Sequence, residues 1–79
     1  MPWRLRVGPY RIGFYAADRH EPPHVHVKRE RWQAKVWLGP SPRLADDGGF
    51  SAREAREIVR IVQAHHAVLM RQWHEFFGV

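Results

Sequence analysis

The feature that most constrains the fold is a change of hydrophobic period at Ser51. Before this residue, apolar and polar side chains alternate, which is typical of half-buried β-strands. After it, apolar side chains recur every three or four residues, which predicts one amphipathic helix over about residues 52–77. Ser51 and Glu54 stand at the spacing of a capping box. In that motif the Ser51 hydroxyl accepts the Glu54 amide proton, and the Glu54 carboxylate accepts the Ser51 amide proton.

The alternating part of the chain divides into short segments separated by turn signals. These segments are residues 3–7, 10–16, 24–29 and 32–38, with a brief further strand over 43–45. Short polar turns between strands favour hairpins and therefore an antiparallel sheet. We predict a single α+β domain over residues 1–79. In it, a three- to four-stranded antiparallel sheet within residues 3–45 packs one face against one long C-terminal helix.

Composition narrows the class of protein. The 79 residues include no cysteine, which excludes disulfides, thiol nucleophiles and thiolate zinc sites. No apolar run reaches the ~20 residues of a membrane span, and residues 1–4 do not begin a signal peptide. We therefore expect a cytoplasmic protein that does not bind a membrane. Thirteen Lys and Arg against eight Asp and Glu give a formal net charge of +5, which favours an anionic partner.

With only one helix predicted, the second face of the sheet has no cover within the chain, and antiparallel sheets can leave one face in water. That face would carry cations and an aromatic ring beside two histidines. The nucleic-acid-binding residues that we predict on it are Arg11, Lys28, Lys35 and Trp37. The same residue types also anchor protein interfaces. A partner protein, or a second copy of the chain in a homodimer, is therefore the alternative occupant of this face.

Two histidines, His24 and His26, stand two residues apart in a predicted strand. Both imidazoles should project from the same face, opposite the helix. One hypothesis makes them the acid and base of a ribonuclease-like reaction. A second makes His20, His24 and His26 the ligands of a divalent transition metal such as zinc, with Asp18 or Glu21 also able to complete the site from the loop. A third gives the histidines only structural hydrogen bonds to the adjacent Pro-Pro turn. No other cofactor is expected.

Four stretches of the chain carry a family resemblance. They are Glu21-Pro22-Pro23-His24-Val25-His26-Val27, Trp37-Leu38, Gly49-Phe50-Ser51 and Trp73-His74-Glu75-Phe76-Phe77-Gly78. On these residues the chain resembles domain-of-unknown-function family 4160, from about Ile12 to Gly78. The resemblance implies a compact bacterial protein, often encoded beside a small protein of domain-of-unknown-function family 2442. That pairing implies a component of a toxin–antitoxin-like module.

We therefore expect the basic, histidine-bearing sheet face to bind RNA or the partner protein. One alternative is a non-catalytic protein-interaction or regulatory module, and another is a small His-x-His metal-binding protein. Salt separates the first two expectations, because nucleic-acid binding weakens steeply with salt through counterion release. Whether the protein is an enzyme is left open at this point.

Overall fold

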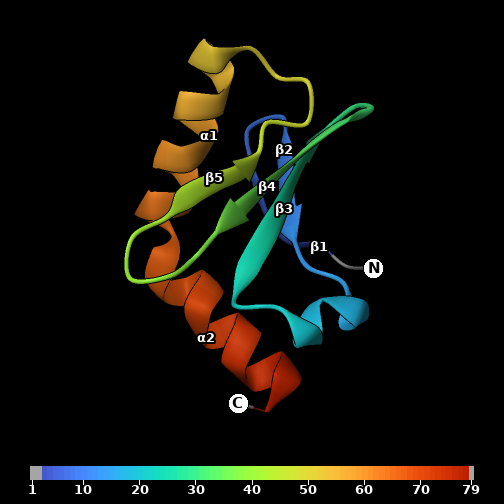
Figure 1. The fold of residues 1–79 in the computed structure, drawn as a ribbon, viewed down its shortest axis with the longest axis vertical. Coiled ribbons are helices and arrows are strands. Elements are labelled where there is room, and N and C mark those ends of the chain that lie inside the picture. Colours follow the sequence, from blue (N-terminus) through green and yellow to red (C-terminus); the bar gives the residue numbers. More distant parts are fainter. Residues whose placement is uncertain (1–2, 79) are drawn as a thin grey trace.

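The computed structural model describes residues 3–78. Five antiparallel strands lie side by side in chain order: β1 (Trp3–Val7), β2 (Tyr10–Gly13), β3 (His24–Arg29), β4 (Trp32–Trp37) and β5 (Arg43–Asp46). A short 3-10 helix, η1 (Ala16–His20), joins β2 to β3, and the helices α1 (Ala52–Ala64) and α2 (His66–Phe77) follow β5. Figure 1 shows both helices on one side of the sheet. The predicted α+β class and antiparallel sheet are confirmed.

The sheet has five strands where three or four were predicted. The additional strand is β5, which pairs with β4 at the edge of the sheet and has all four residues exposed. Such a strand buries no apolar face, so its sequence shows only a weak alternation. The chain reverses between β4 and β5 within residues 38–42, where Gly39 has a φ of +40°.

The predicted single helix is two helices, because the chain breaks at His65. The His65 backbone leaves helical geometry, with φ −112° and ψ 18°, and its ring Nδ1 lies 2.9 Å from the Ile61 carbonyl. A side chain that bonds the carbonyl four residues earlier competes with the helix ladder and bends the helix. The next ring, His66, bonds the carbonyls of Leu38 and Gly39 at 3.1 and 2.7 Å, which ties the start of α2 to the end of β4.

The core lies between the sheet and the two helices. Alternate residues of β3, Val25 and Val27, are fully buried, as the strand pattern predicts. Ile58 and Val62 from α1 and Leu69 from α2 meet them from the helical side of the same cluster. The period of two in the strands and the helical period after Ser51 therefore supply the two halves of one core.

The start of α1 follows only half of the predicted capping box. The Ser51 hydroxyl accepts the Glu54 amide proton at 3.1 Å. The Glu54 carboxylate does not return to the cap, because it accepts hydrogen bonds from the Tyr10 hydroxyl at 2.6 Å and from the Arg29 guanidinium at 2.8 and 3.0 Å. A charged, bidentate donor is a stronger partner than a backbone amide.

Among residues 3–78, neither helix combines the length and the apolar character that crossing a membrane requires.

Candidate metal centre

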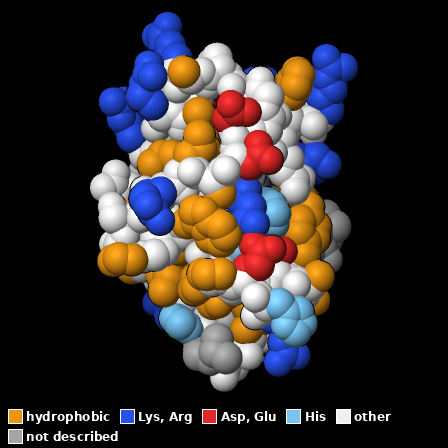
Figure 2. All heavy atoms as spheres, viewed as in Figure 1, with side chains coloured by type: hydrophobic (Ala, Val, Ile, Leu, Met, Phe, Trp, Pro, Cys, Tyr) orange, Lys and Arg blue, Asp and Glu red, His pale blue; other side chains and the backbone are white. Residues whose placement is uncertain are grey.

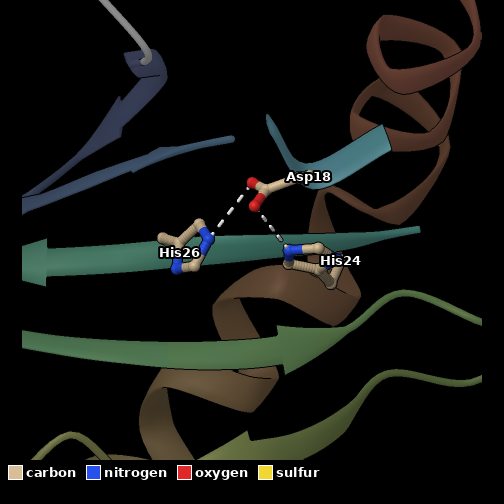
Figure 3. Close-up of side chains that lie close together, drawn as sticks. All are labelled: Asp18, His24 and His26. Atoms are coloured by element: carbon tan, nitrogen blue, oxygen red, sulfur yellow. Dashed lines mark hydrogen bonds and ion pairs between the residues drawn. The ribbon is translucent and has the colours of Figure 1, made fainter. Parts of the chain in front are cut away.

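The two histidines of β3 lie at the end of the strand that η1 approaches (Figure 3). Because successive side chains of a strand point to opposite faces, His24 and His26 share one side and Val25 points to the core. Pro22 and Pro23 precede the strand and end the loop that begins with η1. The chain therefore folds back, and η1 lies over the histidine side of β3.

Asp18 in η1 reaches both imidazoles at once (Figure 3). Its Oδ1 lies 3.3 Å from His24 Nε2, and its Oδ2 lies 3.2 Å from His26 Nε2. One ligand atom from each of the three residues lies within 4.8 Å of the others. The carboxylate is oriented by the Tyr15 amide, which donates to Oδ2 at 2.7 Å, and the Asp18 amide donates to the Tyr15 carbonyl at 2.9 Å. This reciprocal turn fixes Asp18 over the strand.

One ring nitrogen of His24, Nε2, has no hydrogen-bond partner. Its Nδ1 lies 2.9 Å from the Pro22 carbonyl, which can only accept, so Nδ1 carries the ring proton. In the neutral ring Nε2 then holds a lone pair, and it faces the Asp18 carboxylate, which is also an acceptor. His24 Nε2 is fully buried and has no satisfied hydrogen bond. The 3.3 Å approach to Asp18 is therefore attractive only if a second proton or a cation lies between the two groups.

His26 has the electrostatics of a neutral ligand. Burial lowers the pKa of its imidazole, and the nearby His24 and Lys35 lower it further, while Asp18 acts in the opposite direction. The ring is therefore neutral at pH 7, as metal coordination requires. Its second nitrogen, Nδ1, accepts a hydrogen bond from the Gln33 amide nitrogen on β4 at 3.3 Å, and the Tyr15 ring packs 5.0 Å away.

The histidines do not lie on an open sheet face, which corrects the sequence-based expectation. The His24 side chain is 1% exposed, and its ring packs against Trp37 of β4 and Trp73 of α2 at 5.5 and 5.3 Å. His26 is partly covered by η1. Two local features produce this cover, the turn that folds η1 back and the break at His65 that precedes α2.

The other predicted site residues lie outside the cluster of Asp18, His24 and His26. His20 is exposed and lies outside the cluster, where Asp18 takes the third position. Lys35 forms an ion pair with Glu21 and lies 4.5 Å over the Trp37 ring, so these predicted nucleic-acid-binding side chains already have partners within the protein. Arg11 and Lys28 are direct neighbours in the sheet.

Two residues that contact the histidines, Gln33 and Trp73, could not be assigned to the site from the sequence. Gln33 alternates with Lys35 and Trp37 along β4, and nothing in its spacing relates it to His26. Trp73 belongs to the apolar stripe of the helix, but its contact with His24 depends on the direction that α2 takes after the break. The Tyr15 to Asp18 spacing is that of a cap, and this local signal could have favoured Asp18 over His20.

Comparison with known proteins identifies the family. Residues 10–74 match the family model described as "Domain of unknown function (DUF4160)", and the chain belongs to this family, as its sequence resemblance predicted. The comparisons with curated proteins and with solved structures gave no match.

Proposed function

We propose that this protein binds a divalent transition metal through Asp18, His24 and His26. The observation that carries the proposal is the buried His24 Nε2, which has no hydrogen-bond partner and faces the Asp18 carboxylate at 3.3 Å. Two imidazole nitrogens and one carboxylate oxygen form a donor set suited to Zn²⁺ or Fe²⁺. A cation among them converts the unfavourable contact between two acceptors into two coordinate bonds.

The groups around the three ligands are those that a metal site needs. Metal-binding histidines use their second ring nitrogen to contact a backbone carbonyl, a carboxylate or water, which fixes the tautomer. The Pro22 carbonyl supplies that contact for His24. The Gln33 side chain lies beside His26 Nδ1 with its amide nitrogen, and it would supply the contact once the amide turns its oxygen toward the ring. The Tyr15 amide orients Asp18 in the same way. His24 and Asp18 are therefore oriented before a metal arrives.

Three protein ligands favour a reactive site over a purely structural one. A structural zinc site has four protein ligands, whereas a catalytic one keeps a position for water or substrate. His26 and Asp18 are 15% and 14% exposed, so the open position would face solvent on their side, away from His24. The chemistry that a metal would supply there is activation of a bound water or polarisation of a substrate oxygen.

This arrangement favours His24 as a metal ligand and not as a general acid or base. A general acid or base must come within hydrogen-bond reach of its substrate, and His24 is enclosed by two tryptophan rings. The ribonuclease-like activity, the toxin–antitoxin-like module, the homodimer and the partner of family 2442 stay predictions. None of them is needed for the metal site.

Titration calorimetry with ZnCl₂ on the untagged, metal-free protein tests the proposal. We expect one Zn²⁺ per chain, and loss of this binding in Asp18→Ala and in His26→Ala. His20→Ala is the matched control, because His20 is an exposed histidine two residues from Asp18. It should bind as the unmodified protein does. Circular dichroism spectra establish that each variant is folded.

The proposal would be overturned if the folded protein bound no Zn²⁺, Fe²⁺ or Co²⁺. Binding that His20→Ala weakens as much as His26→Ala would also contradict it, because that result would place the metal on surface histidines.

A further inference from the structure

Three cations lie side by side across the first three strands. Arg6 on β1 is paired with Arg11 on β2, and Arg11 is paired with Lys28 on β3. Residues directly opposite each other in an antiparallel pair share a face, so the three side chains form a row across the sheet. Adjacent strands are ~4.8 Å apart, and the row therefore spans about two strand spacings. We call these three residues the cationic row.

The cationic row has no acidic partner among residues 3–78. Arg29 pairs with Glu54 and Lys35 with Glu21, but no ion pair or hydrogen bond joins an Asp or Glu to Arg6, Arg11 or Lys28. Like charges directly opposite each other destabilise a sheet. The fold therefore keeps three mutually repelling cations together without compensating them.

Positive charge is not spread evenly over the protein. On the face drawn in Figure 2, acidic side chains run down the middle, and many Lys and Arg side chains lie toward the edges. Arg6, Arg11 and Lys28 are adjacent in the sheet register and have no acidic partner among the described residues, so their charge is concentrated in one place. A local row of cations selects a ligand with several anionic groups.

Aromatic rings lie beside the cationic row. Trp3 is paired with Gly13 on the same face, and its ring meets Tyr15 edge to face at 6.1 Å, while Tyr15 is 37% exposed. Trp3, Arg6 and Arg11 line an open hollow of about 430 Å³, which Arg4 and Leu5 complete. Guanidinium groups bind phosphate, and an accessible indole stacks on a base.

From this combination we infer that the face formed by β1, β2 and β3 binds single-stranded nucleic acid. The cationic row takes successive phosphates, and Trp3, with Tyr15 at its edge, takes a base. Duplexes do not offer unstacked bases to such a surface. These residues differ in part from those predicted from the sequence. Lys35 pairs with Glu21 and lies over the Trp37 ring. Arg6 and Trp3 therefore replace Lys35 and Trp37 in the proposed surface.

The bound strand would pass beside the metal centre. Gly13 is paired with His26, two residues along β3 from the Arg11–Lys28 pair, a separation of about 7 Å. The inference itself stands on the cationic row and Trp3, and it does not require a metal. Failure of one proposal is therefore distinguishable from failure of the other.

Fluorescence anisotropy with a short labelled oligouridine tests the inference on the metal-free protein over a range of salt concentrations. Each lost phosphate contact removes about 0.7 from the slope of log affinity against log salt. We therefore expect Arg11→Gln/Lys28→Gln to reduce this slope by about 1.4 and the affinity by about tenfold or more. The matched control is Arg53→Gln/Arg60→Gln, which removes the same charge from exposed positions of α1 and should leave the slope unchanged.

Two further arms identify the ligand class. Trp3→Leu, shown to be folded by thermal unfolding, should weaken oligouridine binding about fivefold or more through loss of stacking. It should leave binding of heparin, a polyanion without bases, unchanged. A duplex of the same length should bind more weakly than the single strand.

The inference is overturned if the α1 control loses as much affinity as the β2–β3 variant, since binding would then follow net charge alone. It is also overturned if Trp3→Leu has no effect on oligouridine, or if no oligonucleotide binds at low salt.

Discussion

His24 Nε2 and Asp18 Oδ1 face each other at 3.3 Å inside the protein, while His24 Nδ1 lies 2.9 Å from the Pro22 carbonyl. With the ring neutral, both atoms of the His24–Asp18 contact are acceptors. The two ways of stabilising it, a bound cation and a second ring proton, make opposite predictions for one substitution.

Asp18→Asn should abolish metal binding but leave the metal-free protein as stable as before, or more stable by about 1 kcal/mol. The amide oxygen can keep the hydrogen bonds from Tyr15 and His26, and the amide nitrogen can donate to His24 Nε2. Calorimetry measures the first effect, and urea unfolding in the presence of a chelator measures the second.

The opposite result for stability would show that His24 carries a second proton. Asp18→Asn would then leave a buried cation without its counter-charge, which costs about 3 kcal/mol or more. Asp18→Ala is the control in both cases. It should destabilise the protein, because it removes the acceptor of the Tyr15 amide.

Gln33 should control metal affinity without touching the metal. Once His26 Nε2 binds a cation, Nδ1 carries the ring proton and needs an acceptor. The Gln33 amide nitrogen lies 3.3 Å from Nδ1, so we expect the amide to rotate and present its oxygen when the metal binds. Gln33→Leu should lower the Zn²⁺ affinity by about tenfold or more. Gln33→Glu, which keeps an acceptor, should bind Zn²⁺ at least as tightly as the unmodified protein. Equal affinities for all three proteins would show that His26 is not a ligand.

Zn²⁺ should raise the unfolding temperature strongly. A ligand that binds only the folded state adds about 2.7 kcal/mol at a free concentration 100 times its Kd. For a domain of this size that corresponds to a rise of roughly 10–20 °C. Differential scanning calorimetry with and without Zn²⁺ measures the shift. His26→Ala should show none of it, and His20→Ala should show all of it.

The Glu54 carboxylate should stabilise the fold in a pH-dependent way. Hydrogen bonds from Tyr10 and Arg29 lower the pKa of Glu54 below the ordinary 4.5. Burial of Tyr10 and its hydrogen bond to Glu54 raise the pKa of the Tyr10 hydroxyl to about 12. A carboxyl whose pKa is lowered by folding contributes its full stabilisation above its unfolded pKa and loses it as the pH falls through the folded pKa.

Glu54→Gln should therefore lower the unfolding temperature by a few degrees at pH 7. The difference from the unmodified protein should shrink as the pH falls below 4.5. Glu57→Gln, a change of the same charge at an exposed position of α1, is the control. A gap that stayed constant down to low pH would contradict an ionic origin of the effect.

Gly48→Ala should destabilise the turn that ends β5. Gly48 has φ +61°, and a Cβ at this position would lie 2.0 Å from the Gln33 carbonyl oxygen. The positive φ alone costs about 1 kcal/mol or more, and the β4 backbone would also have to move. Gly8→Ala is the control. Gly8 has a φ of +56° and open space around it, so this variant should show only the conformational cost of the positive φ, without a steric clash. Urea unfolding should show the larger loss at Gly48.

The sequence by itself determined the local structure. The period of two placed Val25 and Val27 in the core and brought His24 and His26 to one side of β3. The apolar stripe after Ser51 determined a helical C-terminal third, and Ser51 caps it as predicted. These features depend only on neighbours within a few residues, so periodicity and capping rules suffice for them.

Only the tertiary structure decided what surrounds the histidines. His20 is nearer to His24 along the sequence than Asp18 is, yet the fold of η1 turns Asp18 inward and leaves His20 in solvent. The sequence predicted β5 only as a brief strand over residues 43–45, and the apolar pattern did not predict the break at His65. β5 is held by its pairing with β4. The His65 ring contacts the Ile61 carbonyl at the break, and hydrogen bonds between His66 and the carbonyls at the end of β4 then direct α2.

The physical reason is that a hydrophobic pattern specifies which side of an element is buried but not which distant element covers it. The contact of Trp73 with His24 joins a helix to a strand across the core, and it depends on the direction of α2 after His65. The same contact encloses His24 and leaves its Nε2 facing Asp18. The local sequence thus placed the two imidazoles, and the packing of η1 and α2 around them made the candidate metal centre.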